Sequence, residues 1–258
     1  MLQLLPVIKD NKIPFIFRLK YLVKESINAF QQLIAEVDQW HVFSTQIDTV
    51  LLLNGIPSKN IFLSQHGVDK VFTNNNLNST MAQKNDASVT FLYVGRFDKV
   101  KGFHTLLQSW CGLKEGVQRK LEIIGEMQTD DENINKVIKM AVARRDILWH
   151  GKKSQAEIAV IMQTVHCTII PSEWVEIGPL VFHEAISRGC DVIASDIGGC
   201  KSLAGLYQTK STLFKAGNIE NLQKAIINFR YSNLTLPVVL QMENYKLVES
   251  QYQQLVNA

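Results

Sequence analysis

The sequence predicts an α/β protein built on a doubly wound parallel sheet, and two observations lead to that prediction. From Val89 onward, short runs of β-branched and aromatic residues alternate with stretches of helical periodicity. Such alternation is typical of parallel strands joined by helices that cover both faces of one sheet. A thinner version of the same alternation occupies residues 1–72, so we expect a partial α/β unit before a complete one.

The complete unit is expected over residues 89–236. Its strands are predicted at residues 89–94, 121–124, 147–149, 166–170, 191–194 and 212–214. Its helices are predicted at residues 102–111, 131–143, 154–163, 179–188 and 219–229. Ser154 followed by Glu157 forms a capping-box pattern, which marks the start of the third of these helices.

The other segments carry weaker patterns. In residues 1–72 we predict strands at residues 14–17, 40–43 and 61–64, with helices at residues 21–37 and 46–54. The polar, asparagine-rich residues 73–88 indicate an exposed linker. Apolar residues recur at near-helical spacing towards the end of the chain, so residues 237–258 are expected to hold a terminal amphipathic helix.

Composition narrows the class of protein. The chain has 258 residues, of which 46% are hydrophobic and 20% charged, enough apolar material for a packed core. A net charge of +3 is too weak to indicate nucleic-acid binding, although it suits a phosphate ligand or an anionic membrane surface. The apolar stretches near the N-terminus are too short for a secretion signal or a membrane span, so we expect a soluble, cytoplasmic protein.

Four cysteines occur without a CxxC pair or a metal-binding spacing with histidine. We expect reduced structural thiols, with Cys167 and Cys190 buried in apolar stretches. None of the six histidines belongs to a visible catalytic or metal-binding set. We therefore predict no metal site, and we interpret His66 and His183 as structural residues.

The first candidate site is the loop that follows the strand at residues 89–94. Gly95 allows a tight turn or the close approach of a ligand, and Arg96 and Lys101 can converge on one anion. In open α/β sheets, ligands bind beyond the carboxyl ends of the strands, where this loop must lie. The alternative is a solvated basic loop without a ligand.

The second candidate site follows the strand that ends at Ile170. Pro179 fits the first turn of a helix, and the free amides of residues 178–181 would then form a positive helix terminus suited to phosphate. Glu176 in the loop and Glu184 inside the helix can line one cleft, where carboxylates suit the hydroxyls of a ribose or a sugar. Alternatively, Glu184 is a solvent-facing residue of the helix.

Glycines follow three further strands. Gly125 and Gly151 each end a predicted strand, and the pair Gly198 and Gly199 follows the strand at residues 191–194. Each position alone is a weak signal, because a glycine pair either admits a ligand or simply makes a turn. Together with the two loops above, they put glycine or glutamate at five strand ends on one sheet edge.

In this order the motifs resemble the retaining family 4, or group 1, glycosyltransferases. The matching positions are Gly95, Arg96, Lys101, Gly102, residues 121–125, Pro171, Ser172, Glu176, Glu184, Ala185, Gly198 and Gly199. Residues 54–61 and 66–69 also resemble the segment before that family's interdomain linker, so the resemblance covers roughly residues 40–256. It implies the GT-B fold, with a complete C-terminal Rossmann-like domain and a partial, truncated N-terminal one.

The resemblance also implies roles for the residues at the sheet edge. Arg96 and Lys101 would neutralise the diphosphate of a nucleoside diphosphate sugar as its negative charge grows, so that no metal is required. Glu176, with the amides of Gly178, Pro179 and Leu180, would hold the transferred sugar. The residues 237–258 would cross back to brace the N-terminal part.

Three further positions follow from the same resemblance. Glu184 would bind the ribose hydroxyls of the donor, and Lys153 would lie near the base. Gly67, in the segment before the linker, would line the donor site. Residues 1–72 would form the acceptor side, and residues 89–236 would bind the nucleotide sugar.

The chain departs from the family pattern at its beginning. About seventy residues precede the linker, the family's glycine-rich loop is absent, and Arg18 to Lys20 stand where a histidine is common. Ser202 also stands where a glutamate often follows the glycine pair. Two hypotheses remain open. One is a retaining glycosyltransferase. The other is an inert nucleotide-sugar-binding remnant, or a subunit that needs a partner for its acceptor domain.

The resemblance further implies a role in polysaccharide or glycolipid biosynthesis. The acceptor would be a sugar, a lipid or a small molecule, which the sequence does not distinguish. Peripheral contact with the inner face of a membrane and self-association are both compatible with it, because apolar surface is expected where a fuller N-terminal domain would pack.

Overall fold

The computed structural model describes residues 15–64, 68–73, 88–116, 118–126, 130–232 and Gln253. Its centre is a six-stranded parallel sheet with the order β5-β4-β3-β6-β7-β8. The strands are β3 (Val89–Val94), β4 (Arg119–Ile124), β5 (Ile147–Gly151), β6 (Cys167–Ile170), β7 (Asp191–Ser195) and β8 (Ser211–Phe214). All six predicted strands are confirmed, with ends shifted by at most two residues. The order reverses between β3 and β6, which makes the sheet doubly wound as predicted.

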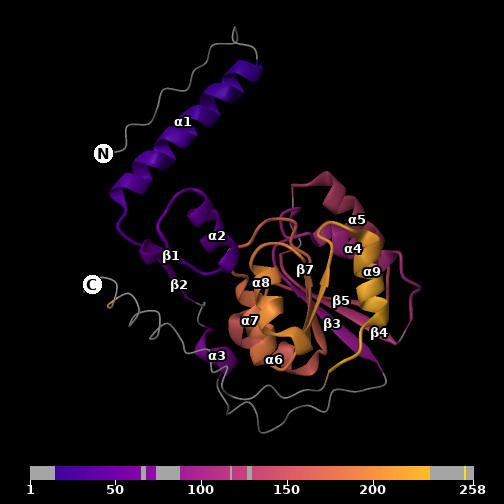
Figure 1. Ribbon diagram of the computed structural model, residues 1–258. Helices are drawn as coiled ribbons and strands as arrows, with labels where there is room; N and C mark the ends of the chain where they lie inside the picture. Colours follow the sequence, from indigo (N-terminus) through magenta and orange to yellow (C-terminus); the bar gives the residue numbers. More distant parts are fainter. Residues whose placement is uncertain are drawn as a thin grey trace.

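Helices cover both faces of this sheet (Figure 1). One face carries α4 (Phe103–Cys111), α5 (Glu132–Val142) and α9 (Ile219–Asn228). The other carries α6 (Gln155–Thr164), α7 (Leu180–Ser187) and α8 (Gly198–Leu206). Alternate strand residues enter two separate cores: Phe91 and Leu121 face the first set of helices, and Leu92 and Ile124 face the second. Burial on both faces explains why these strands are almost continuously apolar in the sequence.

The predicted helix starts depend on local capping, which the structure confirms at Ser154. Its hydroxyl accepts a hydrogen bond from the Glu157 amide at 3.4 Å, and the Glu157 carboxylate accepts one from the Ser154 amide at 2.9 Å. These reciprocal contacts form the capping box at the start of α6.

Helix α8 was not predicted from the sequence. Its first two residues are Gly198 and Gly199, which were interpreted as a turn or a ligand loop. Glycine lowers helix propensity, so the local pattern argued against a helix. The helix forms because Cys200, Leu203 and Ala204 are buried against the sheet.

The N-terminal part is a small α/β unit. It comprises α1 (Phe15–Glu36), β1 (Trp40–Val42), α2 (Thr45–Leu53), the short 3-10 helix η1 (Ser58–Asn60) and β2 (Ile61–Leu63). Strands β1 and β2 pair in parallel, with Val42, Leu51 and Ile56 buried between the elements. The GT-B-type expectation of a partial N-terminal α/β unit is therefore met, with two of the three expected strands among its described residues.

The predicted strand at residues 14–17 is wrong for residues 15–17, which open α1. A three-residue aromatic and β-branched run does not by itself distinguish strand from helix. No glycine or proline separates it from the helical pattern that follows, so one continuous helix forms. Its apolar residues Leu22, Val23, Ile27 and Leu33 are exposed. In Figure 1 the helix stands clear of the main sheet.

Helix α3 (Lys70–Thr73) packs on the main domain, although residues 70–72 were assigned to the N-terminal part and residue 73 to the linker. Val68 and Phe72 are buried in the core beneath α6 and α7. Of the predicted linker 73–88, residues 74–87 lie outside the described residues. The predicted terminal helix at 237–258 also lies outside them, except for Gln253, which is helical. None of the described helices combines the length and the apolar character needed to cross a bilayer.

Candidate functional site

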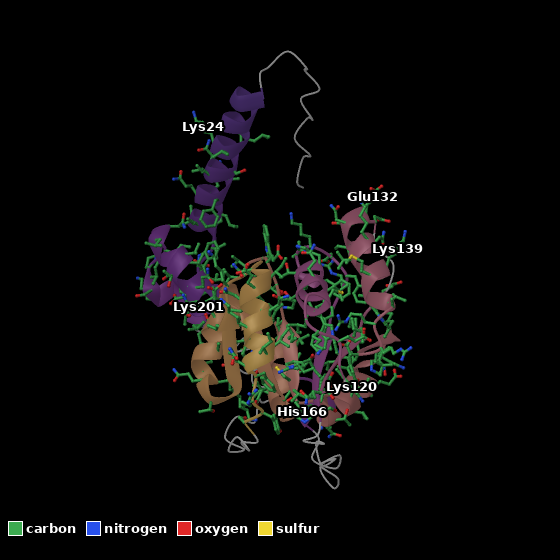
Figure 2. All side chains as sticks on the ribbon, turned by 90° about the vertical axis from the view of Figure 1, so that its right-hand side faces the viewer. Lys24, Lys120, Glu132, Lys139, His166 and Lys201 are labelled. Atoms are coloured by element: carbon green, nitrogen blue, oxygen red, sulfur yellow. The ribbon has the colours of Figure 1, made fainter. Side chains whose placement is uncertain are left out.

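The candidate site lies at the carboxyl edge of the main sheet, where the strand order reverses. The loop after β3 contains Lys101, and the loop after β6 contains Glu176. Because β3 and β6 are adjacent, these two loops meet at the topological switch point, the usual ligand-binding position of doubly wound sheets. Lys120 and His166, at the amino ends of β4 and β6, mark the opposite edge in Figure 2.

Lys101 and Glu176 form an ion pair across the switch point. Nζ of Lys101 is 3.0 Å from Oε2 of Glu176, with side chains 33% and 16% exposed. The other oxygen, Oε1, accepts a hydrogen bond from the Ser172 hydroxyl. The Lys101 amide donates to Oδ1 of Asp98 at 2.7 Å. Two loops far apart in the sequence therefore present one cation and one carboxylate at a partly open surface.

Glycines bring the backbone segments of the site close together. Gly102 has φ +64° and caps α4, and a Cβ there would lie 1.8 Å from the Pro171 carbonyl oxygen. A Cβ on Gly198 would lie 2.7 Å from the Glu176 carbonyl oxygen, which accepts a hydrogen bond from the Gly199 amide at 2.6 Å. The glycine pair thus allows the start of α8 to contact the backbone of Glu176, and it forms part of a helix rather than a turn.

Arg96 lies in the same loop as Lys101 but is more exposed. Its guanidinium pairs with Oδ2 of Asp98 at 3.0 Å, and its side chain is 76% exposed. Asp98 therefore links Arg96 to the Lys101 amide. The Tyr93 hydroxyl donates to the Arg96 carbonyl oxygen at 2.6 Å. Burial raises the pKa of Tyr93 well above its usual range, and the carboxylates of Asp98 and Glu176 raise it further, so both charges act on this buried phenol.

The start of α7 borders the ion pair along the chain. Pro179 is the N-cap rather than a first-turn residue, and Leu180 is the first helical residue. Gly178 is half-buried, Pro179 is buried, and Leu180 is 48% exposed. The first turn contains no acidic residue, so the positive end of α7 is not neutralised by its own side chains.

Glu184 lies one turn inside α7 and is half-buried. Burial, and then the negative charge of Asp69, raise the pKa of its carboxyl to about 7. Asp69 caps α3, where its Oδ1 accepts from the Val71 amide at 2.9 Å. Glu184 therefore lies towards Asp69 and α3. Lys101 and Glu176, in contrast, form an ion pair with each other.

Two predicted site residues remain, Lys153 and Gly67, and the structure describes only Lys153. Lys153 follows β5, and its ammonium is 3.0 Å from the Glu157 carboxylate of α6. Gly67 lies outside the described residues. Among the residues that are described, no group of three or more His, Cys, Asp or Glu side chains could hold a metal ion. All four cysteines are free, and Cys167 and Cys190 are buried as expected.

Sequence reasoning missed three side chains that shape the site: Asp98, Ser172 and Glu173. Asp98 stands between Arg96 and Lys101 in the chain, so its position next to two cationic residues was a usable signal. Ser172 was noted only as a matching position without a role, and its partner Glu176 lies four residues later in the same loop. Glu173 gave no signal, because its partners Thr105 and His104 lie on another segment of the fold. A groove of about 610 Å³ along β8 and α9 contains none of the predicted site residues.

Comparisons with known proteins bear on the family and on the fold. Residues 76–234 match the family profile of the glycosyl transferases group 1. The chain is similar to solved structures of sucrose-phosphate synthase from Thermosynechococcus elongatus, a glycosyltransferase from Rickettsia africae and HepE from Anabaena with UDP. Their TM-scores are 0.64, 0.62 and 0.67, at 21%, 18% and 15% sequence identity. No match to a curated protein sequence was found.

The similarity spans 87%, 84% and 85% of this chain but 59%, 57% and 64% of those chains. This chain thus spans less than two thirds of the length of each. The shared feature is the α/β fold of GT-B type, which confirms the fold class predicted from the sequence.

Proposed function

The chain belongs to the group 1 glycosyltransferases, and we propose that it transfers a sugar from a nucleoside diphosphate sugar to an acceptor with retention of configuration. The observation that carries the proposal is the pair of Lys101 and Glu176 at the switch point of the sheet. In the reaction, the bond between the anomeric carbon and the phosphate oxygen breaks, and the diphosphate keeps the electron pair. An acceptor hydroxyl oxygen bonds to that carbon, and its proton passes to the diphosphate or to solvent.

Lys101 and Arg96 are proposed to bind the diphosphate. Both are cations in one loop. The carboxylate of Asp98 accepts a hydrogen bond from the Lys101 amide and pairs with the Arg96 guanidinium. The negative charge on the diphosphate increases as the glycosidic bond breaks, so a fixed ammonium stabilises the transition state more than the ground state. This role requires no metal ion.

Glu176 is proposed to hold the transferred sugar together with the backbone at Gly178, Pro179 and Leu180. Its carboxylate is fixed by Ser172 and Lys101, which leaves it oriented for a sugar hydroxyl.

The donor's nucleoside is proposed to bind beside the Lys101–Glu176 pair. Glu184 would accept hydrogen bonds from the ribose hydroxyls, and Lys153 and Gly67 would border the nucleotide. HepE, which is similar to this chain, was solved with UDP and glucose, and that complex supports a uridine donor as the first candidate to test.

The domain roles form part of the same proposal. Residues 89–236 would bind the donor, residues 1–72 would contribute the acceptor side, and residues 73–88 would link them. Residues 237–258 would brace the N-terminal part. The solved relatives include a lipopolysaccharide outer core galactosyltransferase, WaaB, which supports a glycolipid or polysaccharide acceptor.

Donor binding is tested by calorimetry with UDP- and GDP-sugars. We expect one of them to bind, and Lys101→Ala to weaken that binding by about 10- to 100-fold, because a charge-assisted contact is lost. Arg96→Ala should also weaken it. Lys99→Ala is the matched control, since Lys99 is an exposed lysine of the same loop. If no donor of the panel binds, the proposed function is wrong.

Turnover distinguishes transfer from binding alone. Donor hydrolysis and sugar transfer are measured for the purified chain, with candidate lipid and saccharide acceptors, and the anomeric configuration of the product is read by NMR. Donor binding without hydrolysis or transfer would support an inert binding protein or a subunit that needs a partner. Transfer with inverted configuration would contradict the retaining mechanism.

A further inference from the structure

The loop after β6 carries a second carboxylate, Glu173, directed at a different helix. Oε1 of Glu173 accepts a hydrogen bond from the Thr105 hydroxyl and lies 3.3 Å from Nε2 of His104. Thr105 and His104 belong to the first turn of α4, the helix that follows the Lys101 loop. The side chains of His104 and Glu173 are only 23% and 21% exposed, so this is not a loosely solvated surface pair.

Backbone contacts join the same two loops. The Glu173 amide donates to the Val100 carbonyl oxygen at 2.9 Å, one residue before Lys101. Gly102 packs against Pro171 so closely that no side chain fits between them. The loop after β6 is therefore attached to the loop after β3 on both sides of Lys101.

Glu173 and Glu176 consequently contact different partners from one short loop. Glu176 pairs with Lys101, while Glu173 contacts the start of α4. The loop that contains Lys101 leads directly into this helix. A carboxylate at this place is favoured by the positive N-terminal end of α4 as well as by the Thr105 hydroxyl. Its removal would take away the side-chain contact between the β6 loop and α4 without removing a charge from the ion pair itself.

We propose that Glu173 is a positioning residue for sugar transfer, which keeps Glu176 in register with Lys101 through Thr105 and His104. The inference rests on the proposed function and adds a residue to it. Donor affinity depends mainly on the charges of the basic loop, which remain when Glu173 is removed. Alignment in the transition state depends on the distance between the loops, and a misplacement of about 1 Å costs roughly 100-fold in rate. Loss of Glu173 therefore acts on kcat.

The test uses the full chain and four variants: Glu173→Ala, Glu173→Gln, Thr105→Val and the double variant Glu173→Ala with Thr105→Val. Glu132→Gln is the matched control, because Glu132 also lies in the first turn of a helix, α5, and is exposed (Figure 2). Steady-state transfer kinetics are measured beside hydrogen exchange of residues 95–102 and 171–178 by mass spectrometry.

We expect Glu173→Ala and Thr105→Val each to lower kcat by about 10- to 100-fold, with the donor KM changed less than about threefold. The double variant should be no slower than the slower single variant, because both changes remove one contact. Glu173→Gln, which keeps an acceptor oxygen for Thr105, should recover most of the rate. Exchange in both loops should rise in Glu173→Ala and Thr105→Val, and Glu132→Gln should leave kinetics and exchange unchanged.

Three results would overturn the proposal. Unchanged exchange in both loops would show that Glu173 does not hold them, and increased exchange with unchanged kcat would show that the contact does not matter for transfer. A rise in KM at constant kcat would place Glu173 in ground-state binding. Failure of the wild-type chain to bind or turn over any donor is a separate result, in which the proposed function fails and this inference with it, whatever the exchange shows.

Discussion

Two lysine–carboxylate pairs of nearly equal length lie at opposite edges of the main sheet. At the carboxyl edge, Nζ of Lys101 is 3.0 Å from Glu176, and the side chains are 33% and 16% exposed. At the amino edge, Nζ of Lys210 is 3.1 Å from Asp191, and the side chains are 1% and 5% exposed. The distance between the charges therefore does not distinguish the two pairs, whereas their burial does.

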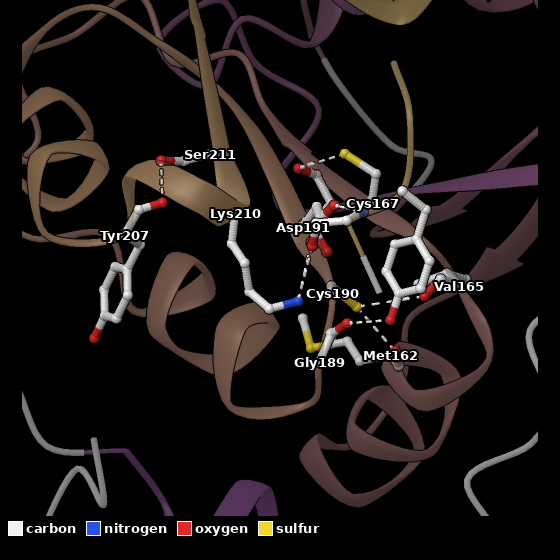
Figure 3. A network of polar contacts seen from close by, with 12 residues as sticks. Met162, Val165, Cys167, Gly189, Cys190, Asp191, Tyr207, Lys210 and Ser211 are labelled. Atoms are coloured by element: carbon white, nitrogen blue, oxygen red, sulfur yellow. Dashed lines mark hydrogen bonds and ion pairs between the residues drawn. The ribbon is translucent and has the colours of Figure 1, made fainter. Parts of the chain in front are cut away.

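The buried pair is surrounded by further polar contacts (Figure 3). Asp191 accepts hydrogen bonds from both the amide and the hydroxyl of Ser232, each at 2.7 Å. Lys210 also donates to the Ser232 hydroxyl at 3.3 Å and lies 5.6 Å from the centre of the Tyr231 ring. Buried charges require such partners, and here they fix the backbone after α9 to the start of β7.

The pair at the carboxyl edge is less enclosed, which leaves its lysine accessible to a further partner beside Glu176. A partly exposed ion pair contributes little to stability, because water stabilises the separated charges nearly as well. A phosphate can therefore join Glu176 beside Lys101 at small cost. The same two residue types thus differ in burial between the two edges, and under the proposed function the pair at the carboxyl edge serves ligand binding.

The largest expected effect is on stability, at the buried pair. Lys210→Met leaves the Asp191 charge without its cation, which should lower the free energy of unfolding by about 3–5 kcal/mol. Donor affinity of the folded variant should stay within about twofold, since the pair is remote from the donor loops. Urea unfolding and calorimetry measure the two quantities. A loss of stability below about 1 kcal/mol would show that the buried Lys210–Asp191 pair stabilises the fold no more than the partly exposed Lys101–Glu176 pair does.

An intermediate effect is expected at Glu184, a carboxyl whose charged neighbour is another acid. Its pKa of about 7 is above the usual value, so the neutral form dominates below pH 7. In the proposed donor complex, ribose hydroxyls would donate to the ionised form and lower this pKa. Donor affinity should therefore rise as pH increases from about 5 to 7, by at most tenfold per pH unit, and level off above it. Calorimetry across this range measures the slope.

Glu184→Gln provides the control for that pH dependence. The amide does not titrate, so the slope between pH 5 and 7 should flatten while some affinity remains. A slope equal to that of the wild type would assign the proton to another group.

The smallest expected effect is on stability at the carboxyl edge. Lys101→Met should lower the free energy of unfolding by about 1 kcal/mol or less, although it should weaken donor binding. Urea unfolding beside Lys210→Met makes this a direct comparison of the same substitution at two edges. Equal losses for the two variants would show that burial does not separate their roles.

Sequence patterns predicted the main sheet well because burial on both faces leaves a clear signal. The run at 89–94 is continuous and apolar, and the observed strand has the same bounds. The pattern failed where packing overrides local preference. Helix α8 begins with two glycines that only its contact with the Glu176 backbone explains, and α1 begins with a run that also suits a strand.

The candidate site was predictable in part. Lys101 and Glu176 stood out because each follows a strand, and carboxyl ends of parallel strands share one edge. Glu173 was not predicted, because its partner Thr105 lies on a helix 68 residues earlier in the chain. Lys210 likewise resembles any surface lysine in sequence, and only the fold shows it to be buried.

The sequence by itself determined the alternation of strands and helices, the family and the set of charged residues at the strand ends. The alternation and the charged positions follow from periodicity and spacing, which act over a few residues, and the family follows from the resemblance of the motifs and the profile match. The tertiary structure decided which lysine is buried, which carboxylate each lysine meets and which glutamate holds α4. Those outcomes depend on strand order and on the distance between loops, which are properties of the packed chain rather than of any local segment.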